Sequence, residues 1–165
     1  MKRPNPPREP KPKPGAIVKA VELLSRREHS KRELRSKLRR GGYEKEEIES
    51  SVDKVVERNY QSDDRFGGVI ARTRVAQGYG PARIRAELKS HGLADAAIRA
   101  AVDATDADWP LIAAAQLKRR FGAKPAADAA ERGRRAQFLL RRGFDPATVR
   151  TVTRAEIGDP EEEFD

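Results

Sequence analysis

The chain has 165 residues, with 35 Lys and Arg against 26 Asp and Glu, and its net charge of +9 favours an anionic partner. It contains no cysteine, which excludes disulfides, thiol catalysis and cysteine-ligated metal sites. The mean hydropathy is −0.82, and no run approaches the roughly 18 consecutive apolar residues of a membrane helix. We therefore expect a cytoplasmic protein with a thin core and no membrane partner.

The first predicted unit follows a stretch rich in Pro, Lys and Arg, which we expect to be a disordered or semi-rigid tail because proline removes backbone donors. Helical periodicity begins at Ile17. Ser30, with Glu33 three residues later, forms a capping box that opens a second helix. Gly41–Gly42 end that helix, and apolar spacing from Ile48 predicts a third.

The same order of signals occurs twice more along the chain. Asp63–Asp64 suit a helix N-terminus, and Gly80–Pro81 is a break followed by a favoured first helical residue. A looser third unit has a capping box at Asp128 and Glu131 and a cap at Asp145. The predicted organisation is a basic tail, three repeats and an acidic tail, over residues 1–15, 16–61, 62–107, 108–155 and 156–165.

One spacing, Leu-x3-Gly-apolar-x4-Ile/Val, occurs in all three units at nearly constant separation. Glycine accepts the left-handed conformation that closes a helix, and the apolar residue after it can pack back on the last turn. The later Ile or Val is then the first core residue of the next helix. The spacing predicts an all-α fold of three tandem three-helix repeats in an elongated array, with its curvature left open. The three sets are Leu38, Gly42, Tyr43, Ile48; Leu88, Gly92, Leu93, Ile98; and Leu139, Gly143, Phe144, Val149.

Residue types that carry out catalysis are scarce. His29 and His91 stand in unrelated contexts with no organised acid cluster beside them, so we expect no metal site. The serines lack a nucleophile-elbow context, and Gly41–Gly42 and Gly67–Gly68 lack the framework of a phosphate-binding loop. We expect no enzyme and no cofactor.

Basic side chains recur around the helix ends, and arginine pairs in a bidentate way with phosphate or carboxylate. An anionic partner is therefore favoured over a role in solvation alone. Since aromatic residues are only 5% of the chain, contacts with the phosphates of single- or double-stranded DNA fit better than base stacking. The candidate residues are Arg26, Arg27, Lys31, Arg32, Arg35, Arg39, Arg40, Arg119, Arg120, Arg134, Arg135, Arg141 and Arg142.

Four stretches of the sequence together resemble the RecX family of recombination regulators. The resemblance extends from about Ala16 to Arg154. Gly67–Gly68 depart from the family pattern, because the family has better helix formers there and each glycine costs up to about 1 kcal/mol in a helix. The stretches are LLSRREHSKRELRSKLRRGG at 23–42, DDRF at 63–66, GYGPARIRAELKSHGL at 78–93 and FLLRRGFDPATV at 138–149.

The resemblance implies three tandem three-helix repeats and a modulator of RecA, the recombinase that forms filaments on single-stranded DNA. Family members lie in the filament groove and inhibit ATP hydrolysis, strand exchange and co-protease activity, which implies roles in recombination, DNA repair and the SOS response. We expect a monomer. Two alternatives remain open: a general DNA-binding helical protein that acts without RecA, and a protein-interaction scaffold whose basic faces serve only solvation.

Overall fold

The computed structural model describes residues 12–155, and within this range the chain forms nine α-helices and no strand. The predicted all-α class is confirmed. Most of the two predicted tails, residues 1–11 and 156–165, lies outside the described range. The helices are α1 Ala16–Arg26, α2 Lys31–Arg40, α3 Lys45–Glu57, α4 Asp63–Ala76, α5 Pro81–Ser90, α6 Asp95–Asp103, α7 Trp109–Phe121, α8 Ala129–Arg141 and α9 Pro146–Ala155.

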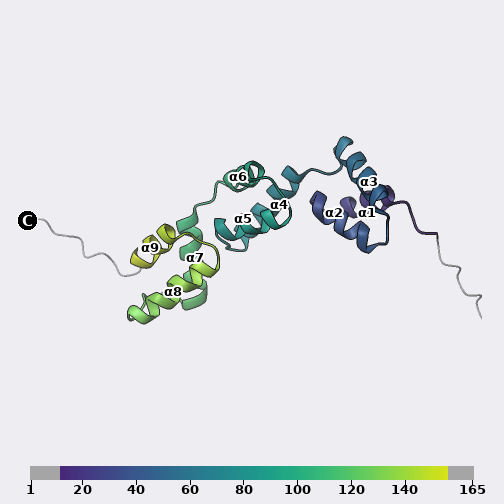
Figure 1. Ribbon diagram of the computed structural model, residues 1–165. Helices are drawn as coiled ribbons and strands as arrows, with labels where there is room; N and C mark the ends of the chain where they lie inside the picture. Colours follow the sequence, from purple (N-terminus) through teal and green to yellow (C-terminus); the bar gives the residue numbers. More distant parts are fainter. Residues whose placement is uncertain (1–11, 156–165) are drawn as a thin grey trace, which may run out of the picture.

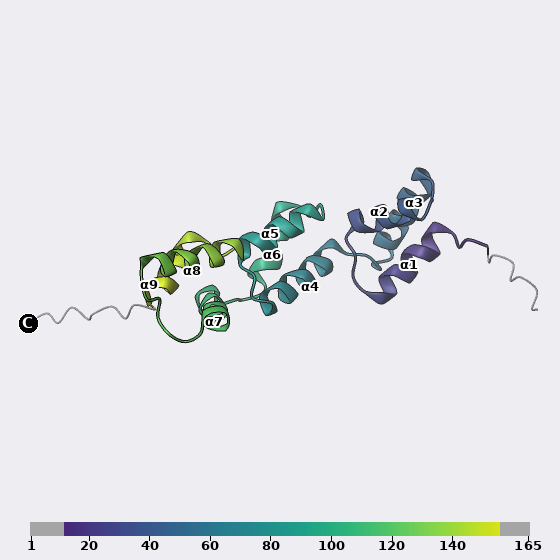
Figure 2. The ribbon, with the colours of Figure 1, turned by 90° about the horizontal axis from the view of Figure 1, so that it is seen from below.

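The helices group into three modules that follow one another along an elongated array. The first module is α1–α3, the second α4–α6 and the third α7–α9, and each helix packs mainly on the other two of its own module. Both ribbon views show the three modules side by side in chain order, with no module folded back on another (Figures 1 and 2). The prediction of tandem three-helix repeats in an elongated array is confirmed.

Each module ends its second helix with the same turn. Gly42, Gly92 and Gly143 have φ values of 74°, 81° and 90°, which an L side chain rarely adopts. The amide of the following residue then donates to the carbonyl of the repeated leucine, at 3.3 Å in the first two modules and 3.2 Å in the third. The repeated spacing in the sequence therefore corresponds to one type of helix-closing turn, which occurs three times in the structure.

Helix starts follow the side-chain caps that the sequence indicates. Ser30 Oγ accepts from the amide of Glu33 at 3.1 Å, and an Asp128 oxygen accepts from the amide of Glu131 at 2.7 Å. Asp145 accepts from the amide of Thr148 at 2.9 Å at the start of α9. Each such cap is worth about 1 kcal/mol, because it satisfies an amide that has no partner within the helix.

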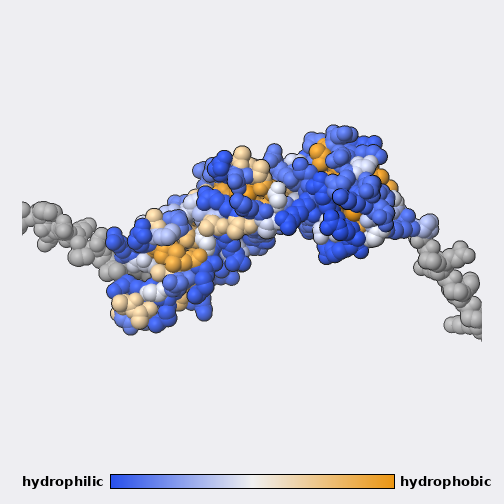
Figure 3. Space-filling view, viewed as in Figure 1, coloured by the Kyte–Doolittle hydropathy of each residue, from blue (hydrophilic) through white to orange (hydrophobic). Residues whose placement is uncertain are grey.

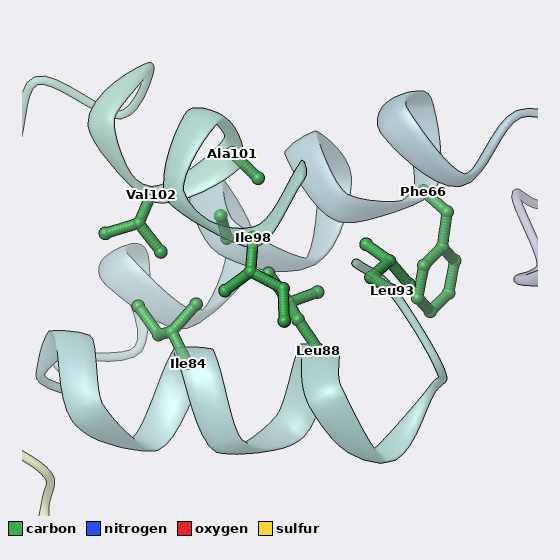
Figure 4. Close-up of a cluster of buried hydrophobic side chains, with 8 residues drawn as sticks. Phe66, Ile84, Leu88, Leu93, Ile98, Ala101 and Val102 are labelled. Carbon is green, nitrogen blue, oxygen red and sulfur yellow. The ribbon is translucent and has the colours of Figure 1, made fainter. Parts of the chain in front are cut away.

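Each module has its own small apolar core. In the second module, Ile84, Leu88, Ile98 and Val102 point toward one another from α5 and α6, and Phe66 of α4 lies beside Leu93 (Figure 4). Burying one such side chain contributes about 1.5–3 kcal/mol. The three cores are separate, and each is small. Because a small core gives limited stability, every module depends on packing against its neighbours for part of its stability.

Gly67 has a packing role in α4. A Cβ at this position would lie 3.0 Å from Leu93 Cδ2 and 3.4 Å from the Cβ of Ala101. The glycine therefore lets α4 approach α6 closely. The packing of the second module therefore explains why a glycine stands at this position, where the sequence departs from the family pattern.

Side-chain hydrogen bonds join the first module to the second. Gln61, on the connection after α3, is buried and donates to the carbonyl of His29 at 3.1 Å. The amide of Lys31 donates to Asp63 at 3.0 Å, and Arg65 pairs with Glu28 at 2.9 Å. We call this set the first junction.

Backbone hydrogen bonds join the second module to the third. The amide of Gly80 donates to the carbonyl of Arg142 at 2.8 Å, and the amide of Ala82 donates to that of Gly143 at 3.0 Å. Trp109 adds an apolar contact, since its side chain packs against the cores of both modules. We call this set the second junction. In the second junction the loop after α4 thus meets the turn after α8. In the first, the loop after α1 also meets the turn after α5, where Ser30 Oγ lies 3.4 Å from His91 Nδ1.

Candidate binding surface

Most candidate cations of the first module already have acidic partners. Arg26 pairs with Glu22 at 2.7 Å, and Arg35 pairs with Glu49 at 2.9 Å. Lys31 lies 3.9 Å from Asp63 across the first junction. These side chains are held on the surface by their own chain, which lowers the charge that they present to a partner.

Arg27 belongs to a half-buried cluster around His29. Arg27 pairs with Glu33, and Lys37 lies 3.5 Å from the same carboxylate. Burial acts to raise the pKa of Glu33, but the hydrogen bond from Arg27 and the nearby positive charges lower that pKa overall. The carboxylate therefore stays ionised and holds Arg27 in place.

Three candidates of the first module remain without such partners. The side chains of Arg32, Arg39 and Arg40 are exposed, and within residues 12–155 none of them forms an ion pair or hydrogen bond. Arg32 lies against Gly92 at the first junction, with its Cδ 3.5 Å from where a Cβ of that glycine would stand. Arg39 and Arg40 extend from the last turn of α2.

Two candidates of the third module act within the fold. Arg135 is only 1% exposed, and it donates to Glu131 at 2.7 Å and to the carbonyl of Lys124 at 3.0 Å. Arg142 crosses the second junction and donates to the carbonyls of Gln77 at 2.6 Å and Gly78 at 2.9 Å. We therefore assign both side chains to structure and leave Arg135 out of the proposed binding surface.

The other four candidates of the third module are available to a partner. Arg119, Arg120, Arg134 and Arg141 are exposed on α7 and α8, and within the described range none of them forms an ion pair or hydrogen bond. Figure 3 shows one face of the molecule, on which hydrophilic surface surrounds smaller hydrophobic patches in all three modules. Four of the unpaired candidate arginines therefore lie on the third module and three on α2.

The candidate set did not include Tyr79 or Arg83, although both lie at the second junction. The guanidinium carbons of Arg83 and Arg142 are each 4.5 Å from the centroid of the Tyr79 ring. The signal in the sequence was the Gly-Tyr-Gly-Pro segment at 78–81, which places an aromatic ring in a loop.

Among residues 12–155, no helix is long and apolar enough to cross a bilayer.

Three tandem three-helix domains with this geometry define the class of protein. Residues 16–54 match the first three-helix domain of RecX, residues 62–102 the second and residues 112–153 the third. These matches cover most of the chain. The chain belongs to the RecX family, as the resemblance in its sequence predicted.

Relatives and solved structures agree with this assignment. The chain is 40% identical over 158 residues to the regulatory protein RecX of Xanthomonas axonopodis pv. citri, covering 92% of this chain and 98% of the relative. It is 42% identical over 153 residues to that of Stenotrophomonas maltophilia strain K279a, covering 93% and 91%. A crystal structure of RecX from Lactobacillus salivarius superposes with a TM-score of 0.72 at 20% identity, covering 86% of this chain and 94% of that one. These relatives are named as regulatory proteins, and the similar structure supports the fold.

Proposed function

We propose that this protein binds RecA–DNA filaments and inhibits RecA in ATP hydrolysis, strand exchange and co-protease activity, without being an enzyme itself. The observation that carries the proposal is membership of the RecX family over all three domains, at 40% identity to a regulatory protein along 98% of that relative's length. The proposed setting is the cytoplasm, and the proposed active form is a monomer.

An elongated array supports a multivalent mechanism. The three modules lie in a row, so one chain can contact successive protomers or exposed phosphates of a long filament. Linked modules raise the effective concentration of the second and third contacts, so weak individual contacts reinforce one another. The unpaired arginines on α2, α7 and α8 are the proposed contact residues, because guanidinium groups form bidentate pairs with carboxylates and phosphates.

The test is a titration of the protein into RecA that is hydrolysing ATP on single-stranded DNA. The DNA is kept in excess, so that competition for strands cannot lower the rate. We expect inhibition at amounts well below one protein per RecA protomer, because an array on the filament affects several protomers at once. A charge-reversed variant of the exposed α8 residues Arg134 and Arg141 that keeps its helical circular dichroism should inhibit less.

An unaffected ATPase rate with folded protein would contradict the proposal. If the protein then also inhibited unrelated DNA-dependent ATPases to the same extent, and only when DNA was limiting, the result would favour general DNA binding without RecA. Absence of both effects, together with no DNA binding at moderate salt, would favour a protein-interaction scaffold.

A further inference from the structure

Three adjoining hollows run across the second junction onto the third module. The middle hollow, of about 570 Å³, lies between the modules and is lined by Tyr79, Arg119, Arg120 and Arg142 among others. A second, of about 540 Å³, shares Arg120 and Phe138 with it and continues along α8. A third, of about 530 Å³, shares Tyr79 and continues onto α5 at Arg83. We call the three together the junction groove.

The junction groove is strongly positive and holds almost no compensating charge. Among the described residues, no Asp or Glu lines the middle hollow or the one along α8. The single carboxylate of the third hollow, Glu87, is held by Arg74 at 2.7 Å, and their hydrogen bond lowers the pKa of Glu87. The exposed guanidinium groups that line the groove therefore have no anion within the chain to neutralise them.

The wall of the groove at the second junction is fixed in place. Arg142 is bound to two backbone carbonyls of the second module, and its guanidinium carbon lies 4.5 Å from the Tyr79 ring centroid and 5.6 Å from that of Phe138. Arg83 lies against the same tyrosine ring at 4.5 Å. The positively charged wall is thus ordered before any ligand binds, which reduces the conformational entropy that is lost on binding.

We infer that the junction groove binds the phosphodiester backbone of a single strand of nucleic acid. Three connected hollows offer a path for a flexible chain of regularly spaced anions, and exposed arginines line all three. A positive groove with aromatic side chains along it is the arrangement found in proteins that bind single strands. Since Arg83 and Arg142 already stack on Tyr79, the phosphates supply most of the affinity and base preference is weak.

A row of three hollows favours a strand over an acidic protein surface. Carboxylates on a folded partner lie on short side chains, and they meet scattered exposed cations as readily as cations that line a continuous path. A single strand is flexible enough to follow the hollows from α5 to α8, whereas a duplex is stiff over this length. The inference rests on the proposed function for its setting, since the strand is a component of the filament, but binding itself can be measured without RecA.

The experiment measures fluorescence anisotropy of a labelled oligothymidylate with the full chain over a range of salt concentrations. The groove variant is Arg120→Gln with Arg141→Gln. The matched control is Lys54→Gln with Arg58→Gln, which removes the same charge from two exposed positions of the first module that are not proposed contact residues. Each phosphate contact on a single strand contributes about 0.7 to the slope of log K against log salt. We expect the slope to fall by about 1.4 in the groove variant and to stay within error of wild type in the control.

Three results would overturn the inference. The first is equal weakening by the groove variant and the control, which would assign binding to net charge. The second is a labelled duplex that binds as tightly as the strand with the same dependence on Arg120 and Arg141, which would remove the single-strand assignment. The third is displacement of the strand by polyglutamate at equal charge concentration, which would assign the groove to acidic proteins.

The two proposals fail in different experiments. If the wild-type chain binds the oligonucleotide in the groove but leaves RecA unaffected, the proposed function is wrong and the groove assignment holds. If the groove variant loses strand binding and still inhibits RecA fully, strand binding stands but is not how inhibition works. Circular dichroism of both double variants is the control that shows whether each remains folded.

Discussion

Arg141 and Arg142 are neighbours in the sequence but have different roles in the structure. Arg141 is exposed and unpaired within residues 12–155, whereas Arg142 holds the second module through the carbonyls of Gln77 and Gly78. The sequence could place the basic residues on helices, but it could not separate paired from unpaired ones. Pairing depends on which carboxylates the neighbouring helices present, as Glu49 of α3 does to Arg35.

Arg142→Ala should destabilise the protein through the second junction. The substitution removes two charge-assisted hydrogen bonds and leaves two carbonyls without this donor, so we expect the free energy of unfolding to fall by about 2–3 kcal/mol. Urea denaturation followed by circular dichroism measures it. Arg141→Ala is the control and should change the stability by no more than about 0.5 kcal/mol. Equal effects of the two substitutions would show that Arg142 does not hold the junction.

His29 should make the stability of the protein depend on pH. Its ring is 2% exposed, with Nδ1 2.9 Å from the carbonyl of Arg27 and Nε2 3.0 Å from Lys37 Nζ. Burial lowers the pKa of His29 below its ordinary value of 6.5; the hydrogen bond to the carbonyl of Arg27 and the charge of Glu33 oppose this, and the charges of Arg27 and Lys37 add to it. The folded protein therefore binds fewer protons here than the unfolded chain does. The stabilisation is present above pH 6.5 and is lost as the pH falls toward the lowered pKa.

The measurement is the urea midpoint of wild type and His29→Gln at several values between neutral and mildly acidic pH. We expect wild type to lose stability on acidification across this interval, and the variant to lose less over the same interval. Glutamine retains a donor and an acceptor, so the variant should still fold. Parallel pH profiles for the two proteins would refute the role of His29.

At the scale of the element, the three modules could be predicted because their signals are local. A leucine, a left-handed glycine and a following apolar residue lie within a short stretch of the chain, from Leu38 to Tyr43 in the first module, so the sequence alone indicates each helix end. The junctions could not be predicted in this way. They join residues such as Gly80 and Arg142, which are far apart in the chain and meet only after two modules have formed.

Gly80→Ala and Gly133→Ala should have opposite effects on stability. A Cβ at Gly80 would collide with the backbone of Gly143, which cannot move aside, so the second junction must open. At Gly133, within α8, a Cβ would meet nothing within 4 Å. We expect Gly133→Ala to stabilise the protein by up to about 1 kcal/mol, because alanine is the better helix former. Thermal unfolding of both variants tests this, and destabilisation by Gly133→Ala would contradict the open space seen there.

At the scale of the whole molecule, stability should follow the linear order of the modules. The middle module takes part in both junctions, and each end module in one. In an array of this kind, stability is close to a sum of module terms and nearest-neighbour terms. Loss of the middle module therefore removes two interfaces, and loss of an end module removes one.

Leu88→Ala and Leu139→Ala test this directly, because the two leucines are equivalent in the repeat and both are fully buried. Each substitution should cost about 2–5 kcal/mol in its own core. Hydrogen exchange with mass spectrometry should then show faster exchange in all three modules for Leu88→Ala. For Leu139→Ala the change should be concentrated in α7–α9. The same exchange pattern in both variants would mean that the array unfolds as a single unit.

The junctions also give the array a direction. In each one, a loop of the earlier module meets a turn of the later module, and a basic residue lies against the glycine of that turn: Arg32 against Gly92 through its side chain, and Arg83 against Gly143 through its backbone and Cβ. In the first module, Lys13 takes this place and donates to the carbonyl of Gly42 at 2.8 Å. Among residues 12–155 the two ends of the array therefore differ: Lys13 covers the turn of the first module, whereas the loop after α7, at 122–128, meets no turn of a later module. A strand also has two different ends, so the array should bind it in one orientation only. A fluorophore on the first module and one on the third should therefore lie at different distances from the 5′ end of a bound strand.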